Sequence, residues 1–248
     1  MLALIAVLAS SCATVRAPFP AEPAAGSTFY AIQQPEGAGP FPAVVILHTC
    51  GGVQPHIKVW MAVLAANGYA SLAVDSFTPR GGGHCNAPGF FPAAVDEVME
   101  DATAALEHLR TRPGIDARRI AVLGFSYGAW AALRVGSPGH RRGGHRFAAA
   151  VAFYPLCTAV AEGASEAGSD NLFADLDTPT LILIGESDND FPGMAASCAA
   201  RVRALQKIDR PVRLKLFPGL AHGFDQYDRN ANREATVEMI QFLRKELQ

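Results

Sequence analysis

The chain has 248 residues, half of them hydrophobic, and a formal net charge of −2 at pH 7. A chain of this length can bury one substantial core, and no shift in composition divides it into separate domains. The small net charge excludes a strong electrostatic attraction for nucleic acid or anionic lipid, and the basic segment 141–146 is short enough to be a solvated turn. The composition therefore favours one globular domain of a size usual for α/β proteins.

The N-terminal segment differs from the rest of the chain. Residues 2–9 are apolar but too few to span a bilayer as a helix, and two serines and Cys12 follow them. Residues 13–26 are rich in alanine and proline, which is typical of a tether. The arrangement resembles a bacterial lipobox, in which the cysteine is lipidated, although Ala9 stands where leucine is usual and no basic residue precedes the apolar run.

We therefore expect three parts: an export signal at 1–12, a tether at 13–26 and a catalytic domain at 27–248. The expected location is the periplasm or the membrane, with a lipid anchor at Cys12. Ordinary cleavage or a misassigned start codon are the alternatives, and a misassigned start would leave the protein cytoplasmic.

The first predicted strands lead into a turn with catalytic potential. Residues 27–33 predict an edge strand, and the apolar run 41–47 predicts a buried one. His48, Cys50 and two glycines come directly after it, an arrangement typical of a tight turn whose amides face a nucleophile. The Cys50 N–H is the candidate oxyanion donor here. His48 is expected to hold the turn, because a catalytic base should come last in the chain.

The next segments predict a parallel crossover. Residues 58–67 have helical spacing and end at Gly68, and 69–74 predict another buried strand. Strand, helix and strand at this spacing indicate a right-handed connection. A glycine-rich loop at 76–85 follows, at the sheet edge where ligands bind in such folds. Residues 93–111 then predict an amphipathic helix.

The chain is organised around GFSYG at 124–128. An apolar strand precedes this motif and an alanine-rich helix follows it, which is the context that a nucleophile elbow requires. The sharp turn between small residues projects the Ser126 hydroxyl above the sheet edge. The backbone amide of Tyr127, at the start of the helix, is the first oxyanion donor.

The second half of the chain supplies an acid and a base. Residues 147–153, 180–185 and 212–217 predict strands, and 194–207 and 233–247 predict helices. The polar excursion 162–177 is long enough to cover part of a site. His222 follows the last strand in a loop of small residues and is the predicted base. Asp188, three residues past Gly185, is favoured as the acid over Asp190, Glu186 and Asp177.

The order serine, aspartate, histidine is that of the α/β-hydrolases. A serine is a poor nucleophile until a neutral imidazole accepts its proton. The imidazolium that forms needs a fixed anion behind it. Ser126, His222 and Asp188 are therefore expected to form a triad that transfers acyl groups.

Five motifs resemble the dienelactone hydrolase family: LHTCGG at 47–52, DSFTPRG at 75–81, GFSYG at 124–128, GESDNDFP at 185–192 and AHGF at 221–224. The resemblance extends from about Phe29 to the C-terminus. It implies an α/β-hydrolase fold, with a mostly parallel sheet and helices on both faces, and the hydrolysis of carboxylic esters or lactones. It assigns the nucleophile to Ser126, the acid to Asp188, the base to His222 and an oxyanion amide to Cys50.

Two departures from the family pattern matter. Characterised dienelactone hydrolases use a cysteine nucleophile where this chain has Ser126. The acidic residue that they carry in the turn after the first buried strand is here Thr49. Both departures favour a general serine esterase over a dedicated dienelactone enzyme.

The resemblance also bears on Arg80. Related enzymes have a carboxylate-binding arginine at the matching place, so Arg80 is a candidate for holding an acidic substrate. The family's second arginine is not matched, because Gln226 takes its place and the nearest candidate is Arg229. The alternative is that Arg80 pairs with a loop carboxylate and serves the structure.

Two other classes of function are alternatives to an esterase. A peptidase or acyltransferase on the same fold is one alternative, and an exported, non-catalytic binding protein is another. A peptidase of this fold usually carries a gating domain, for which 248 residues leave no room. No metal-binding motif and no dinucleotide fingerprint is present in the sequence, so we expect no metal and no cofactor.

The cysteines predict two disulfides. Four remain if Cys12 carries lipid, and four cysteines allow three pairings. Cys50 and Cys85 follow adjacent parallel strands, and Cys157 follows a strand next to the one whose succeeding helix carries Cys198. This placement favours Cys50–Cys85 and Cys157–Cys198, with four buried free thiols as the alternative.

Overall fold

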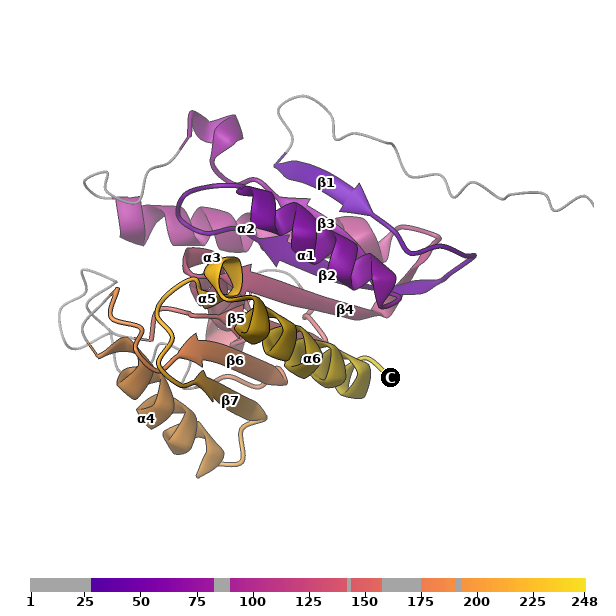
Figure 1. The fold of residues 1–248 in the computed structure, drawn as a ribbon. Coiled ribbons are helices and arrows are strands. Elements are labelled where there is room, and N and C mark those ends of the chain that lie inside the picture. Colours follow the sequence, from indigo (N-terminus) through magenta and orange to yellow (C-terminus); the bar gives the residue numbers. More distant parts are fainter. Residues whose placement is uncertain (1–27, 83–89, 142–143, 158–174, 191–192) are drawn as a thin grey trace, which may run out of the picture.

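The structure is a computed structural model, which describes residues 28–82, 90–141, 144–157, 175–190 and 193–248. Its centre is a seven-stranded sheet with the order β1-β3-β2-β4-β5-β6-β7 (Figure 1). Only β1, at one edge, runs antiparallel to its neighbour, β3. The strands are β1 (Phe29–Gln33), β2 (Phe41–Leu47), β3 (Ala70–Val74), β4 (Ile115–Phe125), β5 (Ala149–Phe153), β6 (Thr180–Gly185) and β7 (Val212–Phe217).

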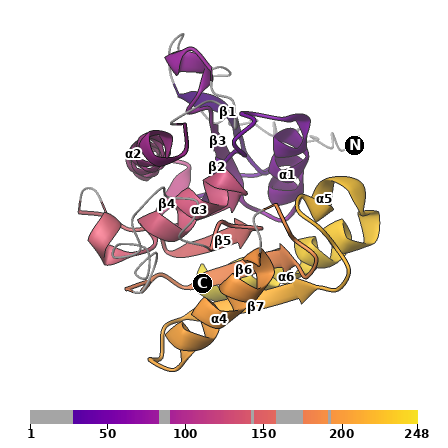
Figure 2. The same ribbon diagram turned by 90° about the vertical axis from the view of Figure 1, so that its left-hand side faces the viewer.

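Helices cover both faces of the sheet, as the view along its edge in Figure 2 shows. The helices α1 and α6 pack on one face, and α2, α3 and α4 pack on the other. A short helix of four residues, α5, lies between β7 and α6. Their bounds are α1 (Pro55–Ala66), α2 (Phe90–Arg110), α3 (Tyr127–Val135), α4 (Met194–Gln206), α5 (Phe224–Tyr227) and α6 (Arg229–Glu246).

The burial of the strands explains why the sheet is covered on both sides. Every residue of β3, β5 and β6 is buried, as expected for parallel strands that lie between two layers of helices. The outer strand β7 is buried only at its two end residues, and β1 is half-buried throughout. The core therefore lies between the central strands and the helices, and the loops at the carboxyl ends of the parallel strands share one edge.

The predicted fold is confirmed, with corrections at helix starts. The helix α6 begins at Arg229, four residues before the predicted start, because Asp228 caps it by accepting hydrogen bonds from the amides of Asn230 and Ala231. The helix α1 begins at Pro55, a residue favoured in a first helical turn. No helix among the described residues is long and apolar enough to cross a membrane.

One of the two predicted disulfides is present. Cys157, after β5, is bonded to Cys198 in α4. Cys50 is also disulfide-bonded, but Cys85 lies outside the described residues, so its pairing with Cys50 stays a prediction. The predicted export signal and tether, with Cys12, also lie outside the described residues, as does most of the 162–177 excursion.

Candidate active site

Ser126 occupies a sharp turn between β4 and α3. Its backbone has φ 52° and ψ −111°, a conformation that side-chain-bearing residues rarely adopt. The amide of Ser126 donates to the carbonyl of Phe153 on the neighbouring strand, at 2.9 Å. A Cβ at Gly124 would overlap the carbonyl of Gly128, so only glycine allows β4 and α3 to approach this closely. The local geometry is that of the predicted nucleophile elbow.

His222 bridges Ser126 and Asp188. Its Nε2 lies 2.8 Å from the Ser126 Oγ, and its Nδ1 lies 2.8 Å from the Asp188 Oδ2. The three side chains come from loops after β4, β6 and β7, which the sheet brings to one edge. A carboxylate behind Nδ1 fixes the tautomer that leaves Nε2 able to accept the serine proton. The predicted residues therefore meet with the geometry that acyl transfer requires.

The loops that carry Asp188 and His222 are held directly against each other. The amide of Ser187 donates to the carbonyl of Leu220 at 2.9 Å. A Cβ at Gly185 would overlap that same carbonyl, so the close approach of the two loops depends on glycine there. This contact sets the distance between the acid and the base.

Burial separates Asp188 from the competing carboxylates. The Asp188 side chain is 0 % exposed, whereas that of Asp190 is 59 % exposed and lies 3.7 Å from the other imidazole nitrogen, Nε2. Glu186 is exposed, and Asp177 forms an ion pair with Arg141. Asp188 is thus the carboxylate placed to orient the imidazole.

Asp188, Asp190 and His222 also lie close enough together to suggest a cation site, since their ligand atoms are within 4.8 Å of one another. Both imidazole nitrogens, however, already lie at hydrogen-bond distance from Ser126 and Asp188. A metal ligand must offer a free nitrogen lone pair. The cluster is better explained as a triad with an extra exposed carboxylate.

The two candidate oxyanion donors come from the start of α3 and from the turn after β2. Tyr127 is the first residue of α3, where the helix dipole favours negative charge. Cys50 lines the same pocket as Ser126, in the turn after β2. This turn is held against α3, because the amide of Gly128 donates to the carbonyl of His48 at 3.1 Å. The structure therefore places Cys50 in the same pocket as Ser126 and Tyr127 directly after it, and the role of their amides stays a prediction.

His48 is buried beneath this turn and has backbone partners on both ring nitrogens. Its Nδ1 lies 2.6 Å from the carbonyl oxygen of Thr49, and its Nε2 accepts from the amide of Ser76 at 3.1 Å. Burial lowers the pKa of His48 below its usual value. The histidine is thus neutral near pH 7, as expected for a residue that holds the turn.

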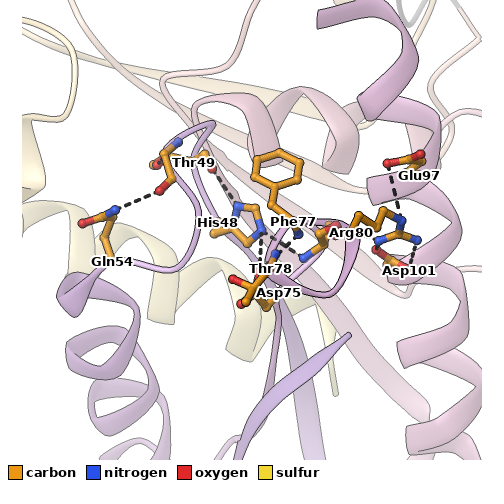
Figure 3. Close-up of polar contacts among 11 residues, drawn as sticks. His48, Thr49, Gln54, Asp75, Phe77, Thr78, Arg80, Glu97 and Asp101 are labelled. Carbon is orange, nitrogen blue, oxygen red and sulfur yellow. Dashed lines mark hydrogen bonds and ion pairs between the residues drawn. The ribbon is translucent and has the colours of Figure 1, made fainter. Parts of the chain in front are cut away.

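Arg80 is directed toward α2 (Figure 3). Its guanidinium forms a bidentate pair with Asp101, at 2.7 and 3.0 Å, and lies 3.4 Å from Glu97. The hydrogen bond with Asp101 raises the pKa of Arg80. Arg80 is not among the described residues that line the pocket at Ser126. The structure therefore favours the alternative in which Arg80 pairs with a nearby carboxylate over the one in which it contacts substrate.

The pocket at Ser126 has a volume of about 490 Å³ and a wide mouth. Its walls include Tyr154, Gln226 and Tyr227. None of these three residues was predicted from the sequence to line the site. A neighbouring cavity of about 730 Å³ shares Gln54 with it and extends toward Arg229 at the start of α6. The two cavities therefore adjoin, and the second lies between α1 and the start of α6.

Behind the pocket lies a buried carboxylate that the sequence analysis missed. Asp225 accepts hydrogen bonds from the Trp60 indole at 2.9 Å and from the Tyr154 hydroxyl at 2.8 Å. The Tyr154 ring packs edge-on against the His222 imidazole, with centroids 4.6 Å apart. Burial raises the pKa of Asp225 above its usual value. A signal was present in the sequence, because Asp225 follows His222 by three residues and Tyr154 directly follows a strand.

Comparison with known proteins identifies the family. Residues 30–247 match the sequence model of the dienelactone hydrolase family. A Bradyrhizobium protein named as a 2-oxo-3-(5-oxofuran-2-ylidene)propanoate lactonase is 24 % identical over 215 residues, covering 84 % of this chain and 83 % of its own. A protein of Escherichia coli K12 named as a carboxymethylenebutenolidase is 25 % identical over 218 residues, covering 84 % and 77 %.

Solved structures share the fold. Esterase 2 of Thermogutta terrifontis, in a form phosphorylated by paraoxon, superposes with a TM-score of 0.68 at 19 % identity, covering 87 % of each chain. At this identity the likeness supports the α/β-hydrolase fold, which the topology of the sheet also shows.

Proposed function

This chain belongs to the dienelactone hydrolase family and is a hydrolase that acts on esters or lactones, and we propose that it does so through a covalent acyl-enzyme on Ser126. The observation that carries the proposal is the hydrogen-bonded series from Ser126 through His222 to Asp188, with both distances at 2.8 Å. A serine and an imidazole at this distance are ready for proton transfer.

In the proposed first half-reaction, the Ser126 Oγ attacks the substrate carbonyl and the His222 Nε2 takes the hydroxyl proton. The Nδ1–H of His222 donates to Asp188, whose negative charge stabilises the imidazolium. The tetrahedral oxyanion accepts hydrogen bonds from the amides of Tyr127 and Cys50. When the carbonyl re-forms, the alcohol leaves with the proton from Nε2, and the acyl group stays on Ser126.

In the second half-reaction, water attacks the acyl-enzyme. His222 accepts a proton from the water, and the same two amides stabilise the second tetrahedral intermediate. Its collapse returns the proton to Ser126 and releases the carboxylic acid. In a lactone the alcohol and the acid belong to one molecule, so a single hydroxy acid is released.

The wide mouth of the pocket supports a serine esterase of broad specificity. The described lining offers amide and phenol groups from Gln54, Gln226 and Tyr227, together with the exposed carboxylate of Asp190. Because Arg80 is paired with Asp101, it supplies no cation to this lining. Neutral and polar esters fit this environment better than strongly anionic ones.

The test combines covalent labelling with kinetics on a panel of nitrophenyl esters and lactones. A fluorophosphonate probe should label the wild-type protein once per chain and leave Ser126→Ala unlabelled. Ser126→Ala and His222→Ala should each lower kcat by about four to six orders of magnitude, and the double variant should lose little more, because triad members act as a unit. Labelling that survives Ser126→Ala, or losses that add, would contradict the proposed mechanism.

A further inference from the structure

The amide of Cys50 belongs to a peptide whose other end is held by a side chain. In a trans peptide the carbonyl and the N–H point in opposite directions, and the bond between Thr49 and Cys50 is trans. Whatever fixes the direction of the Thr49 carbonyl therefore also fixes the direction of the Cys50 N–H. The Thr49 carbonyl oxygen has two partners, the amide of Gly52 at 3.0 Å and the His48 Nδ1 at 2.6 Å.

The partners of His48 leave only one tautomer. A carbonyl oxygen can only accept, so the Nδ1 that faces Thr49 carries the hydrogen. A backbone amide can only donate, so the Nε2 that faces Ser76 carries the lone pair. The imidazole thus connects the turn after β2 with the loop after β3 through one donor and one acceptor. The Phe77 ring packs edge-on against it, 4.6 Å between centroids.

The loop after β3 is in turn anchored to α2, as Figure 3 shows. Arg80 donates to the carbonyl of Ser76 at 2.7 Å and is held by the bidentate pair with Asp101. Asp75 accepts from the amide of Thr78 at 3.0 Å, which fixes the same loop from the other side. Hydrogen bonds and the backbone of Ser76 therefore connect the Asp101 carboxylate with the Thr49 carbonyl.

We propose that His48 is a positioning residue for the oxyanion site. Its Nδ1–H holds the Thr49 carbonyl, and this directs the Cys50 N–H toward the oxyanion. Arg80 and Asp101 anchor the other end of this series of contacts. The inference rests on the proposed function, because it assigns a role to an amide that acts only if a tetrahedral intermediate forms. An amide that is already aligned needs no reorganisation as charge develops.

This role differs from simple support of the fold. A residue that only fills space should affect stability and leave the turnover of folded protein unchanged. A residue that directs an oxyanion donor should lower kcat and leave KM nearly unchanged, since the donor contributes mainly in the transition state. It should also weaken binding of a trifluoromethyl ketone, which forms a tetrahedral adduct with the serine.

The chain of contacts suggests a matched pair of substitutions. The amide nitrogen of asparagine can occupy the place of Nδ1, so His48→Asn retains the donor to Thr49 and loses the acceptor for Ser76. In His48→Gln the amide oxygen can occupy the place of Nε2, so this variant retains the acceptor and loses the donor. Both replace the imidazole by a neutral amide of smaller volume.

We expect His48→Gln to lower kcat on a nitrophenyl ester by about 10–100-fold, with KM within about threefold of wild type. The affinity for a trifluoromethyl ketone should fall by a similar factor. His48→Asn should lower kcat by only about three- to tenfold, because it keeps the donor to Thr49 and loses only the link to Ser76. Thermal unfolding of both variants provides the control for folding. Equal kcat values in the two variants, or a loss confined to KM, would overturn the inference.

Asp101→Asn tests the end of the hydrogen-bonded series that Arg80 and Asp101 form. This variant also keeps the experiment decisive if His48→Gln does not fold. It should lower kcat about three- to tenfold at unchanged KM and weaken the ketone, whereas an unchanged kcat would overturn the inference. Ser126→Ala is assayed in parallel. If that variant keeps its activity, the proposed function fails; if it is inactive while the His48 pair behaves alike, only the positioning role fails.

Discussion

Two histidines near the carboxyl edge of the sheet have hydrogen-bond partners of different kinds, although a carboxylate, Asp75, also lies 4.0 Å from the His48 Nε2. His222 contacts two side chains, the Ser126 hydroxyl and the Asp188 carboxylate, and its side chain is 17 % exposed. His48 is buried, and both its nitrogens contact backbone groups, of Thr49 and Ser76. Both residues follow strands of the same sheet, at the same edge.

The difference shows how partners decide what an imidazole can do. A carboxylate behind Nδ1 stabilises the charged form, so His222 can accept a proton at Nε2. A backbone amide that donates to Nε2 occupies the lone pair, and burial penalises the charge, so His48 stays neutral. The partners of His222 suit proton transfer, and those of His48 suit a fixed geometry.

The largest effect that this comparison predicts comes from removing the charge behind His222. Asp188→Asn keeps the shape of the side chain but allows the wrong tautomer, so kcat should fall by about 10⁴-fold. Asp190→Asn should change kcat by less than about tenfold, because that carboxylate is exposed and lies beside Nε2. Steady-state kinetics on one nitrophenyl ester measures both.

Asp190→Asn serves as the matched control, since both variants replace an aspartate in the same loop by its amide. If the larger loss followed Asp190→Asn, the triad would contain Asp190. In that case the contrast between the two histidines would rest on a different carboxylate.

An intermediate effect is expected on the side of His48. Arg80→Ala removes the anchor of the Ser76 carbonyl, so kcat/KM should fall by about tenfold for an anionic ester and a neutral ester of the same alcohol. Equal losses fit an arginine that acts through the protein. A loss confined to the anionic ester would show that Arg80 contacts substrate after all.

The smallest effect concerns stability. The pKa of His48 is lowered in the folded protein, so below pH 6.5 the unfolded chain takes up a proton that the folded chain does not. The free energy of unfolding should therefore fall as the pH drops below 6.5. His56, whose pKa burial lowers to about 4, contributes in the same direction between about pH 6.5 and 4. Each histidine contributes at most about 1.4 kcal/mol per pH unit.

Urea unfolding at pH 7.5 and pH 5.5 measures this fall. In His48→Asn the fall should be smaller than in wild type, and His56→Gln should show the same change independently. A fall of the same size in His48→Asn would mean that His48 titrates alike in the folded and unfolded chain. That result would contradict the conclusion that burial keeps His48 neutral in the folded protein.

Local patterns in the sequence sufficed to predict that the side chains of Ser126, His222 and Asp188 meet. The strands before Ser126, Asp188 and His222 are short apolar runs, and parallel strands must bring their carboxyl ends to one edge. Cys157 and Cys198 were paired by the same argument, and the structure contains that bond. In each case the chain order and the topology of the sheet determine which residues meet.

Contacts between side chains far apart in the sequence were not predictable. The position of Asp225, three residues after His222, places it near the site, but neither local sequence indicates that it meets Trp60, 165 residues away. The direction of the Arg80 side chain also depends on a distant partner, Asp101 in α2. Without a carboxylate at that position, the guanidinium would be free to face the substrate. Helix starts shifted for a related reason, because a single cap such as Asp228 outweighs hydrophobic spacing.

The close backbone approaches at Gly124 and Gly185 have a consequence for the evolution of this protein. Any other residue at either position would collide with a carbonyl of a neighbouring segment, so no point mutation there can be neutral. Gln54, Gln226 and Tyr227, by contrast, are exposed on the wall of the pocket. We therefore expect substitutions at these wall positions to alter substrate preference at a much smaller cost in stability than substitutions at the two glycines.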